Sequence, residues 1–403
     1  MKILLLTPDL PYPSESGVAI RNMGIIRGLA AGGRRLSLVS FAEKAADAAS
    51  NPLFDLCEEV HVVRAPSHGK LKRIVKLLGS GQADVAFRLA SAEYRRVLSG
   101  LLQANAYDLI QFAGIELACY LPLITSAKKS AKVVYDAQNA EAELQRVVAR
   151  VDRGETRRLP TALYSTIQSA RLQQFERSIC RAVDAVIAVS EQDRGFLLKH
   201  GGAPVRVMSN GIHVAEYKPV ADAARAPCQL VFSGKMDYRP NVDAVEWFHS
   251  AVYPLVREGN PQARLLIVGR NPHRRLQHLA DDEYVRVTGW VESVLPFLHE
   301  AAIYIAPLRM GSGTRLKILQ AMAAGCAVVS TSIGAAGLNE ETRGALLIAD
   351  GAQDFADAVC ALLADEARRR EMGALAQRQV KKHYDWSALI PRLLQVYAEL
   401  GLG

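Results

Sequence analysis

The chain has 403 residues, a length that exceeds one ordinary hydrophobic core and predicts two domains of about 200 residues each. Half of the residues are hydrophobic, 22% are charged and the formal net charge is +8, a composition that excludes an intrinsically disordered chain. The longest apolar stretch, residues 109–124, is interrupted by Gln111 and Glu116, so no stretch reaches the roughly 18 apolar residues of a membrane-spanning helix. Lys2–Thr7 is too short for the apolar part of a signal peptide. We therefore expect a cytoplasmic protein, attached to a membrane at most at its surface.

The six cysteines indicate neither a metal site nor a disulfide framework. No two of them have CxxC spacing, and no cluster of histidines accompanies them. We expect reduced thiols in the core of a cytosolic protein, and no bound metal. Their positions are Cys57, Cys119, Cys180, Cys228, Cys326 and Cys360.

Basic residues are concentrated in two stretches. Two interpretations stay open: a solvated helix face, or attraction to anionic lipid head groups or to a phosphorylated acceptor. Nucleic acid is not an expected partner, because no aromatic residues are interleaved with the basic ones. The basic residues are Lys70, Lys72, Arg73 and Lys76 in the first stretch, and Arg146, Arg150, Arg153, Arg157 and Arg158 in the second.

The first half of the chain alternates short apolar segments with amphipathic ones. Lys2–Thr7 is followed by a loop with Pro11, Pro13 and Gly17, then by apolar residues at helical spacing from Ile20 to Ala30. Apolar strands joined by helices predict a buried parallel sheet. Further strands are expected at 36–41, 108–112, 132–135, 184–190 and 205–208, and a long helix at 159–181.

The pattern starts again after the turn signal Asn210-Gly211 and a linker at 215–227 that is rich in Ala, Pro and charge. The predicted fold is therefore two successive doubly wound α/β domains, with ligands outside the carboxyl ends of the strands and a cleft between the halves as the default site. Strands are expected at 229–232, 264–268, 285–288, 302–306 and 327–330, and helices at 243–256, 315–324, 353–363, 366–382 and 386–400.

The segment 311–331 is the most informative part of the sequence. A glycine-rich loop runs into a helix N-terminus, where free backbone N–H groups and the helix dipole favour an anion. Gly311 and Gly313 allow close approach of a phosphate, and Arg315 and Lys317 add positive charge. The alternative interpretation is an ordinary turn between strand and helix, followed by a helix with surface charges.

The order of motifs along nearly the whole chain resembles the retaining glycosyltransferases of family 4, which have the GT-B fold, and most of all bacterial sugar transferases of surface-polysaccharide assembly. The resemblance implies two facing Rossmann-like domains: residues 1–208 for the acceptor, with 386–403 packing back on them, and residues 209–385 for a nucleotide-sugar donor. The matching segments are the Gly17 loop, 135–139, 189–191, 210–212, 232–241, 269–270, 289–291, 311–331 and Trp386.

The resemblance also implies a donor site. Gly17 is expected beside the donor phosphates, Lys235 and, one position off the usual place, Arg239 at the diphosphate, and the turn at Gly289 against the base. The full set of expected donor contacts is Gly17, Gly234, Arg270, Gly289, Trp290, Val291, Ser312, Gly313, Thr314, Arg315, Lys317 and Gln320. A surface charge at a strand end is the alternative interpretation of Lys235.

Three positions depart from the family pattern. Ser312 and Gln320 occupy the places of two glutamates that bind the donor in the family, and Gln138 stands where many relatives have a histidine beside the sugar. Because charged hydrogen bonds are about twice as strong as neutral ones, the loss at Gln320 is roughly 1 kcal/mol, or some fivefold in affinity.

The implied mechanism needs no metal, no other cofactor and no protein nucleophile. The acceptor hydroxyl attacks as the diphosphate leaves on the same face of the sugar, and Lys235, Arg239 and Gln138 are the expected catalytic residues. Arg21, Glu116 and Asn139 are the expected acceptor contacts, although Arg21 and Glu116 also suit solvated positions.

The predicted reaction transfers a sugar from a nucleotide-diphosphate sugar to a growing, lipid-linked polysaccharide or glycolipid. Two alternatives stay open. Ser312 and Gln320 are compatible with a degenerate, non-catalytic subunit that scaffolds a polysaccharide assembly complex. A nucleotide-sugar epimerase with the same fold is the other.

Overall fold

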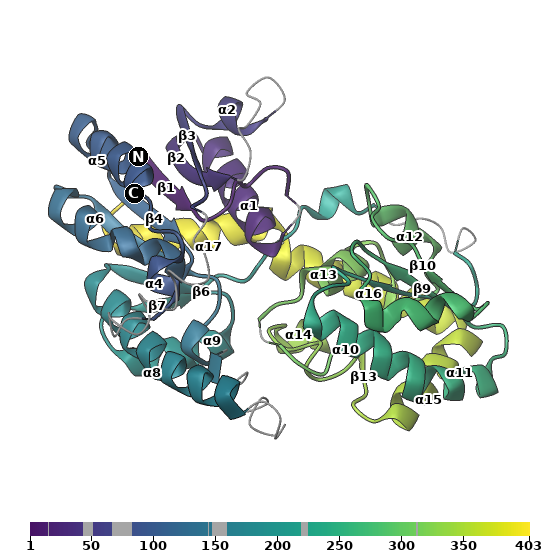
Figure 1. The fold of residues 1–403 in the computed structure, drawn as a ribbon. Coiled ribbons are helices and arrows are strands. Elements are labelled where there is room, and N and C mark those ends of the chain that lie inside the picture. The colour runs from purple at the N-terminus through teal and green to yellow at the C-terminus, as the bar shows by residue number, and fades with distance from the viewer. Residues whose placement is uncertain are drawn as a thin grey trace. The chain divides into compact units, whose positions relative to one another are not determined.

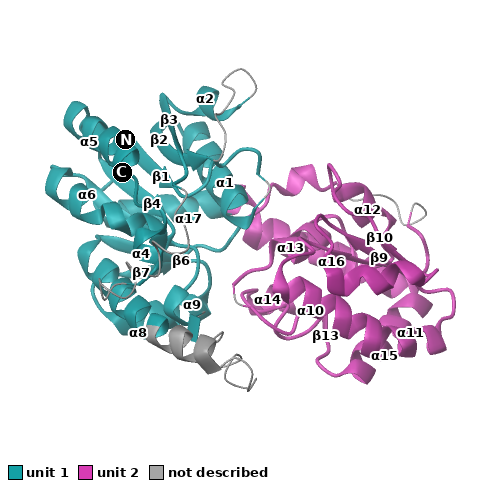
Figure 2. Cartoon of the chain, in the orientation of Figure 1, with its two compact units in different colours: residues 1–210, 389–403 teal, residues 211–388 magenta. Residues whose placement is uncertain are grey.

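The computed structural model describes residues 1–14, 16–42, 51–66, 83–143, 145–146, 159–218, 225–311 and 313–403. The chain divides into two compact units, residues 1–210 with 389–403, and residues 211–388 (Figures 1 and 2). Ser312 lies outside the described residues. So do most of the basic residues of the two stretches noted above, namely Lys70, Lys72, Arg73, Lys76, Arg150, Arg153, Arg157 and Arg158.

The first unit is built on a seven-stranded parallel sheet of order β3-β2-β1-β4-β5-β6-β7. Its elements are β1 Lys2–Thr7, α1 Gly17–Ala31, β2 Arg35–Ala42, α2 Leu53–Leu56, β3 Glu59–Arg64, α4 Val85–Arg88, α5 Ala92–Ala104, β4 Leu109–Ala113, η2 Ile115–Tyr120, α6 Leu121–Ala127, β5 Lys132–Ala137, α8 Leu159–Ala182, β6 Ala185–Ala188, α9 Glu191–Leu197, η4 Leu198–His200 and β7 Val205–Val207.

Helix α17, Trp386–Glu399, passes from the second unit into the first, because residues from Leu389 onward belong to the first. There the Tyr397 hydroxyl donates to Gln111 Oε1 at 2.5 Å, and Glu399 pairs with Arg206 at 2.8 Å. In the described part of the chain, no helix is long and apolar enough to cross a membrane.

The second unit has a six-stranded parallel sheet of order β10-β9-β8-β11-β12-β13. Its elements are η5 Val214–Glu216, β8 Gln229–Ser233, α10 Arg239–Trp247, η7 Phe248–Val252, α11 Tyr253–Gly259, β9 Arg264–Val268, η8 Arg274–Asp281, β10 Val285–Val287, α12 Leu295–Glu300, β11 Ile303–Ala306, α13 Leu316–Ala323, β12 Ala327–Ser330, α14 Glu340–Arg343, β13 Leu347–Ile348, α15 Ala352–Ala364 and α16 Glu366–Tyr384.

Alternate side chains of the central strands of the second unit enter two different apolar cores. Leu230 and Phe232 of β8 pack with α10, α11 and α15 on one face, whereas Val231, between them, packs with α13 and α16 on the other. Both faces of a parallel sheet are thus covered, as the continuous apolar strands predict.

The expected strands and all but one of the expected helices occur, with bounds within a few residues of the predicted ones. The predicted helix 243–256 is instead three segments, α10, the π-helical η7 and α11. Pro254 lies in the first turn of α11 and has no amide hydrogen, so the regular hydrogen bonding changes there.

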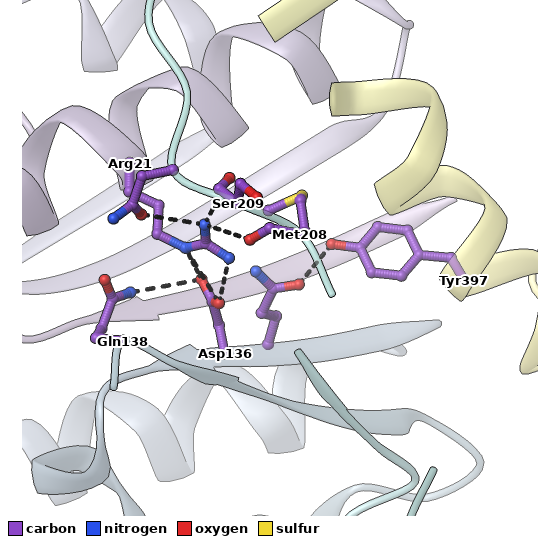
Figure 3. A network of polar contacts seen from close by, with 8 residues as sticks. Arg21, Asp136, Gln138, Met208, Ser209 and Tyr397 are labelled. Atoms are coloured by element: carbon purple, nitrogen blue, oxygen red, sulfur yellow. Dashed lines mark hydrogen bonds and ion pairs between the residues drawn. The ribbon is translucent and has the colours of Figure 1, made fainter. Parts of the chain in front are cut away.

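A wholly buried ion pair joins three parts of the first unit. Arg21 of α1 donates to the Asp136 carboxylate of β5, with Nη2 at 2.7 Å from Oδ1 and Nε at 2.9 Å from Oδ2. Its Nη1 donates to the carbonyl oxygens of Met208 and Ser209 and to Asn210 Oδ1 (Figure 3). The expected acceptor contact of Arg21 is wrong, because this side chain is 0% exposed and its guanidinium binds groups of the protein itself.

We predict that Arg21→Met lowers the free energy of unfolding by about 3–5 kcal/mol, because it leaves the Asp136 carboxylate buried without its cation. Arg35→Met is the matched control, since Arg35 pairs with Glu58 at the surface and its side chain is 63% exposed. The control should lower the free energy of unfolding far less, because solvent screens an exposed ion pair. Urea denaturation followed by circular dichroism measures both, and equal losses would contradict the structural role of the buried pair.

Candidate functional site

The order of strands in the second unit gives its sheet one switch point. Chain connections run outward from β8 through β9 to β10 on one side, and from β11 through β12 to β13 on the other. The turns that follow β8 and β11 therefore lie next to each other at the carboxyl ends of neighbouring strands, which is where ligands bind in open α/β sheets.

The turns after β8 and β9 approach each other so closely that only glycine fits. A Cβ added to Gly269 would lie 1.7 Å from the carbonyl oxygen of Gly234. Gly234 N–H donates to the Val268 carbonyl at 2.9 Å, and Met236 N–H donates to that of Arg270 at 2.9 Å. These contacts fix the backbone that carries Lys235 and Arg270.

The turn after β10 is attached to the same cluster. Gly289 forms an antiparallel bridge with Gly269, and the Gly269 N–H donates to Thr288 Oγ1 at 3.3 Å. Trp290 is 67% exposed at this turn, whereas Val291 packs on the core. The structure thus brings together Gly234, Gly269 and Gly289. Two of these glycines, Gly234 and Gly289, were expected donor contacts, as was Arg270.

The loop after β11 leads into α13, and Arg315 precedes its first residue. Gly311 has a φ of 115°, and a Cβ there would lie 2.5 Å from Arg315 Nη2. Gly311 therefore makes room for the Arg315 guanidinium, in addition to any ligand. Thr314 is buried, and its hydroxyl donates to the Gly337 carbonyl at 3.1 Å, which anchors the loop.

Lys317, one residue into α13, reaches back to the turn after β8. Its Nζ donates to Asn241 Oδ1 at 2.7 Å and lies 4.3 Å from the centroid of the Phe232 ring. Burial, followed by the positive charge of Arg315, lowers the pKa of Lys317 to about 7. Asn241 was not among the predicted site residues.

Lys235 and Arg239 have exposed side chains at this edge. Lys235 Nζ lies 3.4 Å from Asp237 Oδ1, with half of its side chain open to solvent, so it can turn toward a ligand. Arg239 is the first residue of α10, beyond the turn itself.

Gln320 is in the last turns of α13, and its Nε2 donates to the Tyr217 hydroxyl at 2.8 Å. This hydrogen bond uses one of the two amide hydrogens and leaves the amide oxygen to accept from a ligand. Among the described residues of both units, no group of three His, Cys, Asp or Glu side chains is placed to hold a metal ion.

The first unit has a hollow of about 290 Å³ at the carboxyl ends of β1, β4 and β5, the switch point of that sheet. Gln138, Asn139 and Glu116 line it. Gln138 was expected beside the sugar, and Asn139 and Glu116 were expected to contact the acceptor. Gly17 is the first residue of α1, whose N-terminus is capped by Ser16, and the adjacent Val18 lines the hollow. The hollow is at the small end of ligand pockets and suits one sugar ring.

The charged side chains of this hollow form ion pairs and hydrogen bonds with other residues that line it. Glu116 pairs with Arg88 at 3.4 Å, and Asn139 Nδ2 donates to Glu141 Oε1 at 3.0 Å. Burial raises the pKa of Glu141, which the Asn139 amide opposes and the negative charge of Glu116 favours. Arg88 and Glu141 were not predicted, because neither falls in a motif that the sequence pattern singles out.

Two parallel-sheet units with glycine-rich strand ends define the class of protein. The chain belongs to the glycosyltransferases: residues 16–211 match the glycosyl transferase 4-like domain, and residues 227–365 match the glycosyl transferases group 1 family. The predicted GT-B fold is thereby confirmed.

Individual proteins similar to this chain in sequence or structure are consistent with this family. The phosphatidyl-myo-inositol mannosyltransferase of Mycolicibacterium smegmatis is 29% identical over 58% of this chain, an alignment that spans only 62% of that relative's length. Sucrose-phosphate synthase from Thermosynechococcus elongatus has a similar structure, with a TM-score of 0.72, 19% identity and 99% of each chain covered. The HepE protein of Anabaena, solved in complex with UDP, has a TM-score of 0.65 and 14% identity, over 99% of this chain and 100% of that one.

We predict that Gly269→Ala destabilises the second unit by about 3 kcal/mol, because the new Cβ would overlap the Gly234 carbonyl. All three tryptophans, Trp247, Trp290 and Trp386, belong to this unit, so thermal unfolding followed by tryptophan fluorescence reports on it.

Gly259→Ala is a second-unit control, where the nearest atom is the flexible Cys360 side chain at 2.9 Å, and it should cost markedly less. Equal losses at the two positions would contradict the close approach of the β8 and β9 turns.

Proposed function

We propose that this protein is a retaining glycosyltransferase that transfers a sugar from a nucleoside-diphosphate sugar to a glycan or lipid-linked acceptor. The observation that carries the proposal is the convergence of glycine-rich strand ends with Lys235, Arg315 and Lys317 at one edge of the second sheet. Backbone that a ligand can approach closely, combined with cations and the start of α13, is suited to a diphosphate.

The proposed reaction forms a bond from an acceptor oxygen to the anomeric carbon and breaks the bond from that carbon to the diphosphate. The acceptor proton passes to a diphosphate oxygen on the same face of the sugar. The negative charge that develops on the leaving group is stabilised by fixed positive charges and amides, so neither a metal nor a protein nucleophile is required. Lys235 is the proposed principal cation, with Arg239 as a further one.

The acceptor is proposed to bind in the hollow of the first unit, where Gln138, Asn139 and Glu116 offer hydrogen bonds to hydroxyl groups. The mannosyltransferase relative is named for a lipid that contains inositol, which supports a lipid-linked acceptor. HepE supports a nucleoside diphosphate as the leaving group, since its structure holds UDP.

The first prediction from this proposal is that one nucleoside diphosphate stabilises the protein without magnesium. A panel of UDP, GDP, ADP, CDP and dTDP is tested by thermal shift, with and without the metal. Ligand at about 100 times its dissociation constant adds about 2.7 kcal/mol, which raises the midpoint by several degrees. If none of the five shifts the midpoint in either condition, the proposal fails and a non-catalytic scaffolding role is favoured.

The second prediction is that Lys235→Ala lowers turnover of the corresponding donor at least tenfold, because the leaving diphosphate loses its principal cation. The thermal midpoint should stay within about one degree, since this lysine is exposed. Release of nucleoside diphosphate is measured with and without a glycan acceptor. Lys381→Ala, at an exposed position of α16, is the control. Unchanged turnover of the Lys235 variant would refute its role, and release that ignores the acceptor would favour an epimerase.

A further inference from the structure

The side-chain amide of Asn241 forms a bridge between two parts of the donor-side cluster. Its Nδ2 donates to the Lys235 carbonyl at 2.8 Å, and its Oδ1 accepts from Lys317 Nζ at 2.7 Å. A carbonyl only accepts and an ammonium only donates, so the orientation of the amide is determined by its two partners. Asn241 is only 4% exposed, which keeps this arrangement out of competition with water.

The bridge places the Lys317 ammonium directly against the turn after β8. A Cβ added to Gly234 would lie 2.6 Å from Lys317 Nζ and 2.7 Å from Asn241 Nδ2. Gly234 is therefore needed to make room for the lysine and the amide together. Lys317 lies 76 positions after Asn241 in the sequence, so this contact depends on the fold and not on a local motif.

Among the residues that the structure describes, Lys317 has neutral partners only. Within the described residues its contacts are the Asn241 amide and the Phe232 ring, and no carboxylate pairs with it. Its charged neighbour is Arg315, which has the same sign. A cation that is partly withdrawn from water, held in one place and not neutralised by the protein is suited to an anionic ligand.

We propose that Asn241 is a positioning residue, which holds Lys317 as a second cation for the donor diphosphate beside Lys235. The inference rests on the proposed function and adds to it, since it assigns a cation on α13 to the diphosphate and names the residue that holds this cation in place. Arg239 begins α10 with an exposed side chain, whereas Asn241, two residues further on, points a different cation toward the turn.

The arrangement makes diphosphate binding dependent on pH. Lys317 is faced by the Phe232 ring and the backbone of the β8 turn, by the Asn241 amide from α10 and by Arg315 from its own loop, none of which titrates near neutrality. Since its pKa lies at about 7, the free protein loses this proton as the pH rises, and a diphosphate that needs the ammonium then binds more weakly.

The test measures the dissociation constant of the nucleoside diphosphate from the panel by calorimetry between pH 7.5 and 8.5, below the pH at which the bases ionise, and without metal. A terminal phosphate has a pKa near 6 and is already ionised there, so the pH dependence comes from the protein. Wild-type affinity should fall by up to about tenfold per pH unit. Lys317→Met should bind at least fivefold more weakly at pH 7.5 and lose this pH dependence, whereas Lys381→Met should match the wild type.

Two variants of Asn241 test the positioning role. Asn241→Leu removes both hydrogen bonds and should weaken binding at least fivefold. Asn241→Asp places a carboxylate beside Lys317, which keeps the lysine protonated to higher pH, so affinity falls at pH 7.5 but its decline with pH flattens. A purely structural residue would change the thermal midpoint and leave the pH profile alone, and the Asp variant keeps the test decisive if the Leu variant does not fold.

If Lys317→Met binds the nucleoside diphosphate with the same affinity and pH dependence as the wild type, the inference is refuted and the proposed function stays in place. An unchanged pH profile in Asn241→Asp would refute the role of Asn241. Failure of every nucleoside diphosphate to bind the wild type would instead refute the proposed function itself.

Discussion

The parallel direction of every strand pair in the second unit is the constraint on which the candidate site depends. It delivers the carboxyl ends of all six strands to one edge, so turns from distant parts of the sequence must share a small volume. Gly234 and Gly269 are consequences of this crowding, because their backbones meet at a separation that no Cβ tolerates. The close approach leaves amides and cations exposed to a ligand at the same edge.

Two buried or partly buried cations differ in the charge of their partners. Arg21 is wholly buried and donates hydrogen bonds to Asp136 and to the segment 208–210, so its charge is compensated within the protein (Figure 3). Lys317 is held by a neutral amide beside another cation. A compensated charge contributes to structure, whereas an uncompensated one beside a glycine-rich turn indicates a binding site.

The fold could be predicted from the sequence because buried parallel strands are continuous apolar runs, such as the one at 264–268. Strand β3 was not predicted, since Glu59–Arg64 lies at the edge of the sheet and mixes charged with apolar residues. The site was harder to predict. The pattern around Arg21 gave no indication that Asp136, far away in sequence, would bury its charge, and the Asn241–Lys317 bridge likewise requires the fold to be known. The motif positions of Lys235 and Arg315 could be located, but their partners could not.

The most direct test of the account is hydrogen–deuterium exchange of the full chain, with and without the nucleoside diphosphate that binds. The account places the diphosphate at the carboxyl edge of the second sheet. It predicts slower exchange in peptides that cover the turns after β8, β9 and β10 and the start of α13, with the far ends of the same strands unchanged. Binding that leaves these four segments unprotected would contradict the central claim.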